Sequence, residues 1–143
     1  YRTYIIDDLE IERGIRSYPL MWKKAETKPK VCFIGCPHLS LGQLEKWTDA
    51  ITAALAKTGR TKVAIPTILC AAPDVLKVFQ KDRSRYQRLL ATGARLTSIC
   101  ALMYMNNPLC AKKPVITNSN KLRTYTTAKF LLDDEILDRI VHG

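Results

Sequence analysis

The clearest pattern of apolar and polar positions lies in the first half of the chain. Residues 31–34 are consecutive apolar residues, a run typical of a strand that is covered on both faces, and Gly35 marks its end. Pro37 lacks a backbone N–H and disfavours helical backbone at the residue before it, so we expect the strand to stop at Cys36. The pattern therefore predicts a short buried strand followed by a tight turn.

A helix is predicted directly after this turn. Ser40 and Gln43 have the spacing of a capping box, in which each side chain accepts a backbone N–H at the start of a helix. Apolar residues then recur at steps of three and four as far as Leu55, so one face of this helix is expected to pack on the sheet. Cys36 and His38 would lie in the loop between strand and helix, at the edge where open α/β sheets bind ligands.

The alternation of strands and helices continues to the end of the chain. Further strands are predicted at residues 62–69, 95–99 and 114–117, with helices at about 8–15, 73–92 and 133–141, the last capped by Asp133 or Asp134. Asn and Pro residues make the stretch 101–113 an expected irregular connection. We therefore expect an α/β fold: a layered domain over 30–143, with a mainly parallel sheet and flanking helices, after an N-terminal helix and connector over 1–29.

Cysteines and polar residues follow directly after several predicted strands. Because the carboxyl ends of parallel strands share one edge, Cys36, Cys100 and the turn 118–121 are expected to converge there, and Cys70 also follows a predicted strand. Converging thiolates without the compact spacing of a zinc site suit a soft metal centre, and thiolates are the usual ligands of iron–sulfur clusters. The alternative for each cysteine is a small buried residue, which is the interpretation we favour for Cys32 inside its strand.

Two further groups could take part in chemistry. His38, next to Cys36, is a candidate acid–base group or hydrogen-bond donor to a substrate, or simply a loop residue that bonds a backbone carbonyl. Residues 118–121, at the start of a predicted helix, offer N–H groups, side-chain donors and a cation to a carboxylate or phosphate. The same four residues are equally typical of a helix cap.

Charge and cysteine content narrow the function classes. The formal charge is +10, but the basic residues spread along all 143 residues without a nucleic-acid-binding signature, so we disfavour a nucleic-acid partner. Five cysteines, an odd number without paired C-x-x-C spacing, argue against a disulfide framework and a zinc ribbon. Without a signal peptide or a membrane-spanning run, we expect a cytoplasmic protein with no membrane partner. The sequence begins with Tyr1 rather than Met, in the middle of a pattern of apolar and polar residues, so we expect it to be a piece of a longer chain.

Three motifs together resemble a known family. GCPHLSLGQL at 35–44, the cysteine that closes SIC at 100, and TNSNK at 117–121 with Tyr125 are similar to the carboxyl-terminal part of the aconitase X large subunit. The order and spacing fit from about Lys30 to Tyr125, and GCPH after an apolar strand is the most specific part. The resemblance implies an aconitase-like α/β fold.

The same resemblance implies a dehydratase, that is, a hydro-lyase, in which three cysteines hold an iron–sulfur cluster of the [4Fe-4S] or [2Fe-2S] type. Cys36 and Cys100 match two of these ligands, and the third lies outside this chain. The implied partners are the remainder of the large subunit, a small swivelling subunit or domain, and a small anionic substrate. As a fragment alone, the chain would be inactive.

Residue roles follow from the match of motifs. Ser119 is the candidate base and His38 a second catalytic candidate, and the candidate substrate-binding residues are Ser40, Asn118, Lys121 and Arg123. Among the family's substrates we favour cis-3-hydroxy-L-proline over 5-phosphomevalonate. A non-catalytic α/β binding module is the alternative from another class.

Overall fold

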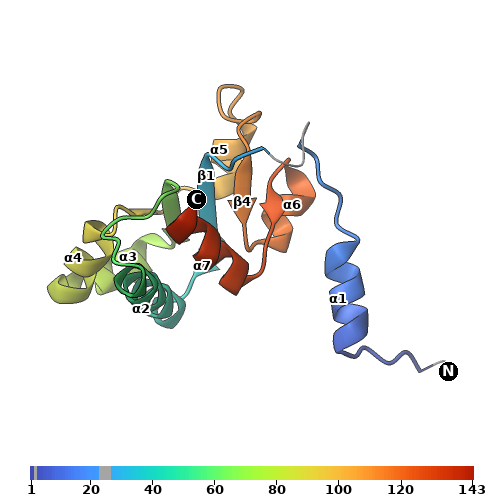
Figure 1. The fold of residues 1–143 in the computed structure, drawn as a ribbon, viewed down its shortest axis with the longest axis horizontal. Helices are drawn as coiled ribbons and strands as arrows, with labels where there is room; N and C mark the ends of the chain where they lie inside the picture. The colour runs from blue at the N-terminus through green and yellow to red at the C-terminus, as the bar shows by residue number, and fades with distance from the viewer. Residues whose placement is uncertain (2, 23–26) are drawn as a thin grey trace.

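A parallel sheet forms the centre of the structure (Figure 1). The computed structural model describes residues 1, 3–22 and 27–143. In chain order, its elements are α1 (Asp8–Arg16), β1 (Val31–Leu39), α2 (Leu41–Lys57), β2 (Thr67–Ala71), α3 (Pro73–Lys81), α4 (Arg83–Ala91), β3 (Arg95–Thr97), α5 (Ala101–Asn106), β4 (Val115–Thr117), α6 (Asn120–Tyr125), β5 (Lys129–Phe130) and α7 (Asp133–His142). The strand order is β3-β2-β1-β4-β5 and each neighbouring pair is parallel, so the predicted layered α/β fold is confirmed.

Helices cover both faces of the sheet. Cys32 and Ile34 of β1 belong to the apolar cluster that includes residues of α2, α3, α4 and α7. Val31 and Phe33 alternate with them and belong to a second cluster, with residues of α5 and α6. Figure 1 shows the two groups of helices on either side of β1 and β4. The unbroken apolar run of β1 is thus explained by burial on both faces.

Cys32 is a core residue, as the sequence indicates. Its side chain is fully buried, and burial raises the pKa of its thiol. We expect Cys32→Ser to lower the free energy of unfolding by about 1 to 3 kcal/mol, because the hydroxyl would be buried without a partner. Urea denaturation measures this loss. The control Cys110→Ser, at a partly exposed cysteine, should change stability by less than about 0.5 kcal/mol, and equal losses in the two variants would contradict the prediction.

The predicted capping box opens α2. Ser40 Oγ accepts the Gln43 N–H at 3.3 Å, and Gln43 Oε1 accepts the Ser40 N–H at 2.9 Å. The helix then buries its predicted face against the sheet, and it ends at Lys57, two residues after Leu55, the last apolar position of the predicted pattern. Gly59, which follows, has the positive φ of 66° that the left-handed backbone after a helix requires.

The first strand is longer than predicted. β1 runs to Leu39, so the expectation that it stops at Cys36 is wrong, and Cys36 and His38 lie in the last part of the strand. Its regular pairing with β2 breaks after Ile34 and resumes where Leu39 pairs with Ala71. The cause is Gly35, whose φ of 97° redirects the chain without ending its path along β2.

The second strand lies further along the chain than predicted. β2 begins after Pro66, because proline cannot donate to the ladder. The segment before β2 forms hydrogen bonds outside the sheet instead: the Val63 N–H, for example, donates to the Thr92 carbonyl oxygen at 2.9 Å. Cys70, expected after the strand, therefore lies within it.

The single helix predicted over 73–92 is two helices. Asp82 interrupts it and caps the second, since its carboxylate accepts the Arg85 N–H at 3.0 Å. An aspartate within a helical pattern favours this competing arrangement. Apolar spacing continues across the break, which is why periodicity alone does not reveal it.

Four differences concern the second half of the chain. β3 ends at Thr97 rather than Ile99, and α5 occupies part of the connection that was expected to be irregular. β5 is only two residues long, too short for a pattern to indicate it. α7 is not capped by Asp133 or Asp134; instead Glu135 accepts the Leu132 N–H at 2.8 Å.

The N-terminal helix is present but has no buried residue. Asp7 caps α1, since its side chain accepts the Glu10 N–H at 2.8 Å. The helix stands apart from the layered part of the structure in Figure 1. Among the residues described, no helix has both the length and the apolar content to cross a membrane.

Candidate functional site: a thiol cluster at the edge of the sheet

Three cysteines meet on the α5–α6 side of the sheet, and we call Cys36, Cys70 and Cys100 the thiol cluster. Cys36 lies near the end of β1, Cys70 within β2, and Cys100 immediately before α5. All three belong to the same apolar cluster. Cys70 is fully buried, Cys36 is 6% exposed and Cys100 is partly exposed, so solvent reaches the cluster mainly at Cys100. The parallel topology thus brings together residues from three separate segments.

The thiols influence one another electrostatically. Burial raises the pKa of Cys36, a hydrogen bond with Ser119 lowers it, and the neighbouring Cys100 thiol raises it. The positive charge of Lys121 lowers the pKa of Cys36, which is opposite to the effect of burial. Burial raises the pKa of Cys70 to about 12, and the charges of the other two thiols add to this effect. Cys36 is therefore the thiol of this cluster that has both a hydrogen-bond donor and a cation at hand.

Ser119 links the start of α6 to the end of β1. Its hydroxyl donates to the Cys36 carbonyl oxygen and accepts the Leu122 N–H at 2.9 Å, so it also caps α6. A second link runs beside it: Thr117 Oγ1 donates to the Phe33 carbonyl at 2.8 Å and accepts the Ser119 N–H at 3.1 Å. These contacts fix the backbone of Cys36 relative to the first turn of α6.

We expect Ser119→Ala to disturb Cys36 as well as the fold. Loss of the cap should lower the free energy of unfolding by about 1 to 2 kcal/mol. Loss of the hydrogen bond should also raise the pKa of Cys36, so the half-maximal rate of its alkylation in metal-free protein should move to higher pH, as measured by peptide mass spectrometry. Ser40→Ala removes a helix cap elsewhere and is the matched control: it should reduce stability similarly without moving the alkylation profile. Identical profiles for the two variants would show that Ser119 is only a cap.

A cavity of about 290 Å³ adjoins the cluster. Its lining includes Cys36, His38, Asn118 and Ser119, so the structure brings these predicted site residues together. The His38 side chain is exposed, whereas the Asn118 amide donates to Asp133 Oδ1 at 2.8 Å and is held against the start of α7. The cavity thus has a thiol, an imidazole, an amide and a hydroxyl within its walls.

Three of the four predicted substrate-binding residues, Ser40, Lys121 and Arg123, lie outside this lining. Ser40 is engaged in the α2 capping box. The Arg123 guanidinium lies 3.7 Å from the ring centroid of Tyr18, and its Nε donates to Asn120 Oδ1 at 3.0 Å. Lys121 is not in the lining either, but its charge acts on the Cys36 thiol.

The chemistry of the donor set fits a thiolate-bound centre that is completed by another segment. Within residues 1, 3–22 and 27–143, no three Cys, His, Asp or Glu side chains are arranged to hold a metal ion. Cys36 and Cys100 form a close pair, and although burial raises the pKa of Cys36, Ser119 and Lys121 partly offset this rise. These two residues could therefore supply two ligands to a soft metal centre, with the rest coming from elsewhere.

Gly35 is a site residue that sequence analysis treated only as the end of a strand. A Cβ at this position would overlap the Cys70 carbonyl oxygen and lie 2.7 Å from Leu39 Cγ. The absence of a side chain therefore lets the Cys36 segment approach β2 closely. A glycine directly before a candidate ligand was the available signal, but it could not reveal which backbone lies opposite.

Comparison with known proteins identifies the family of this chain. The family model described as the aconitase X third domain matches residues 29–132. The crystal structure of Thermococcus kodakaraensis aconitase X, in its holo-form, is similar with a TM-score of 0.66 and 20% identity; the match covers 96% of this chain and 33% of that one, so the chain spans about a third of its length. No curated protein matches the sequence. Since the family model covers more than half of the chain and the fold agrees, the chain belongs to the aconitase X family and contains its third domain.

Proposed function

We propose that this chain is part of an iron–sulfur-dependent dehydratase, a hydro-lyase, to which it contributes two thiolate ligands and one wall of the substrate site. The observation that carries the proposal is the close pair of Cys36 and Cys100 thiols beside the cavity that contains His38 and Ser119. A third ligand would come from the remainder of the large subunit, and a small swivelling subunit or domain would close the site. Membership of the family supports the reaction class.

Lys121, His38 and Ser119, which lie in or near the cavity, have proposed roles. An iron–sulfur cluster held by Cys36 and Cys100 would supply a Lewis acid for the leaving hydroxyl. Lys121 offers its ammonium to a substrate carboxylate, and the exposed imidazole of His38 is placed to accept or return a proton. Ser119 would need to leave the Cys36 carbonyl in order to accept a proton, so in the arrangement seen here it orients Cys36.

For the substrate we propose cis-3-hydroxy-L-proline, with 5-phosphomevalonate as the alternative. Both carry a carboxylate and a hydroxyl group that can be lost as water. A cavity of about 290 Å³, with Lys121 as the cation that acts on Cys36, suits one carboxylate on a small ring better than a longer, phosphorylated acid. The phosphate would require further cations.

The intact protein, purified anaerobically with its partner subunit or domain, tests the proposal. Iron content and loss of the hydroxyl group should be measured for both substrates. Turnover of the hydroxyproline alone supports the proposal, and turnover of 5-phosphomevalonate alone selects the alternative. Protein without iron and without activity on either substrate would instead indicate a non-catalytic α/β binding module.

A further inference from the structure

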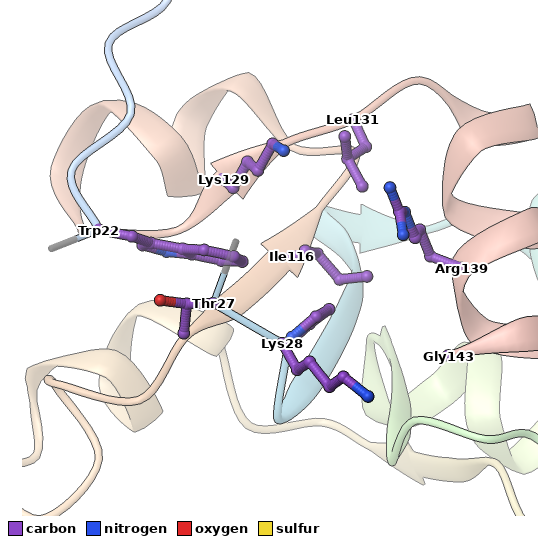
Figure 2. A pocket seen from close by; sticks show the side chains of 9 residues that line it. Trp22, Thr27, Lys28, Ile116, Lys129, Leu131, Arg139 and Gly143 are labelled. Carbon is purple, nitrogen blue, oxygen red and sulfur yellow. The ribbon is translucent and has the colours of Figure 1, made fainter. Parts of the chain in front are cut away.

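A second cavity, of about 230 Å³, lies near the other end of β1 (Figure 2). Lys28 and Pro29, which precede β1, form part of its lining, whereas Cys36 lies near the end of that strand. Strand β5 and helix α7 contribute Lys129 and Arg139. None of its lining residues is shared with the cavity at the thiol cluster. The pocket is therefore separate from the site proposed above.

The polar lining of this pocket is cationic. Lys28, Lys129 and Arg139 come from three segments of the chain, and in Figure 2 their side chains surround Ile116. Among the residues that the structure describes, no acidic side chain belongs to the lining, and none of the three cations forms an ion pair. Lys129 is half-buried, whereas Lys28 and Arg139 are exposed, and an anion bound among like charges reduces their mutual repulsion.

The remaining walls are apolar and well held. Ile116 is only 1% exposed and forms the floor beneath the cations. The Trp22 indole N–H donates to the Thr127 carbonyl at 2.9 Å, which anchors the ring at one side, and Lys129 Nζ lies 6.0 Å from the ring centroid. Apolar walls reduce the local screening by water, so the half-buried Lys129 attracts an anion more strongly than the exposed Lys28 and Arg139 do.

We propose that this pocket binds a compact oxyanion of the phosphate type, carrying two negative charges. Ammonium groups from two sides and a guanidinium from a third match oxygen atoms that point in several directions. Chloride has no such separate acceptors. The proposal concerns residues that the dehydratase mechanism does not use, so it stands or falls independently of that mechanism.

Tryptophan fluorescence of the intact protein measures the binding directly. Trp22 lines the pocket, whereas Trp47 is buried in the α2 face of the core and should not respond. Inorganic phosphate, and separately the monoester glycerol 2-phosphate, should change the emission in a saturable way at constant ionic strength, and Trp22→Phe should abolish the change. A response to phosphate alone defines a free-phosphate site, and a tighter response to the monoester defines a site for phosphorylated metabolites.

Matched charge variants decide whether the pocket is responsible. Arg139→Gln and Lys129→Gln should each weaken phosphate binding by about tenfold or more in calorimetry, because a charged hydrogen bond is lost. Arg83→Gln removes the same charge at the exposed start of α4 and should leave the affinity unchanged. Equal affinities in all three variants, or a phosphate response no larger than that of chloride at the same ionic strength, would overturn the proposal.

Discussion

Replacing Cys36 or Cys100 by serine should remove iron and activity from the intact protein while leaving its folded content almost unchanged. A serine hydroxyl is not deprotonated at neutral pH and is a poor ligand for a soft metal, whereas the two thiols form a close pair at the edge of the sheet. We expect activity to fall by more than about 100-fold, since even supporting residues of metal sites change activity by 10- to 100-fold. Iron analysis, visible absorbance and circular dichroism measure the three quantities.

The control for this experiment is a cysteine outside the thiol cluster. Cys110 is partly exposed and lies in the connection between α5 and β4, so Cys110→Ser should retain iron and activity. Full iron content in Cys36→Ser would show that this residue is not a ligand. Loss of folded content in Cys36→Ser and Cys100→Ser, together with loss of iron, would instead assign the two cysteines to the core.

Gly35→Ala should be the most destabilising single substitution at the site. With φ at 97°, the backbone conformation is one that residues with a side chain rarely adopt. The new methyl group would also overlap the Cys70 carbonyl, which is backbone and cannot rotate away. We expect the free energy of unfolding to fall by roughly 3 kcal/mol or more. Denaturant unfolding of the metal-free protein measures this separately from any loss of iron.

Gly42 provides a matched glycine in the next element. It lies in the first turn of α2, and a Cβ there would have no neighbour within 4 Å. Gly42→Ala should therefore leave stability unchanged or raise it by up to about 1 kcal/mol, because alanine favours the helix. If both variants unfolded at the same denaturant concentration, the close approach of Gly35 to β2 would not contribute to stability.

Local chemistry made much of the fold predictable. The apolar run at the start of β1 and the Ser40–Gln43 capping box each depend on neighbouring residues, and each is found where it was predicted. The convergence of Cys36 and Cys100 was also predictable, because parallel strands place their carboxyl ends on one edge. Sequence patterns thus predict well the order of the elements and the edge of the sheet at which the strands end.

The parts that were missed depend on tertiary contacts. Asp82 divides a helix whose apolar spacing is continuous, and β5 forms only because β4 offers it a partner. The course of the chain at Gly35, alongside β2, depends on which residues of β1 and β2 are paired. The sequence of β1 alone does not reveal this register. The bond from Ser119 to Cys36 joins residues 83 positions apart, so a local pattern shows Ser119 only as a helix cap. The roles of the individual site residues remain proposals for the same reason.

The unequal helical layers have a dynamic consequence. The face with the thiol cluster is covered by α5 and α6, which are six residues long each, whereas the other face carries the 17-residue α2 and three further helices. Helices of six residues have little stability of their own, so this thinner layer should open first in local fluctuations. Amide hydrogens of α5 and α6 should therefore exchange with deuterium well before those of α2. Such opening would expose the buried sulfur atoms while the opposite half of the domain stays folded.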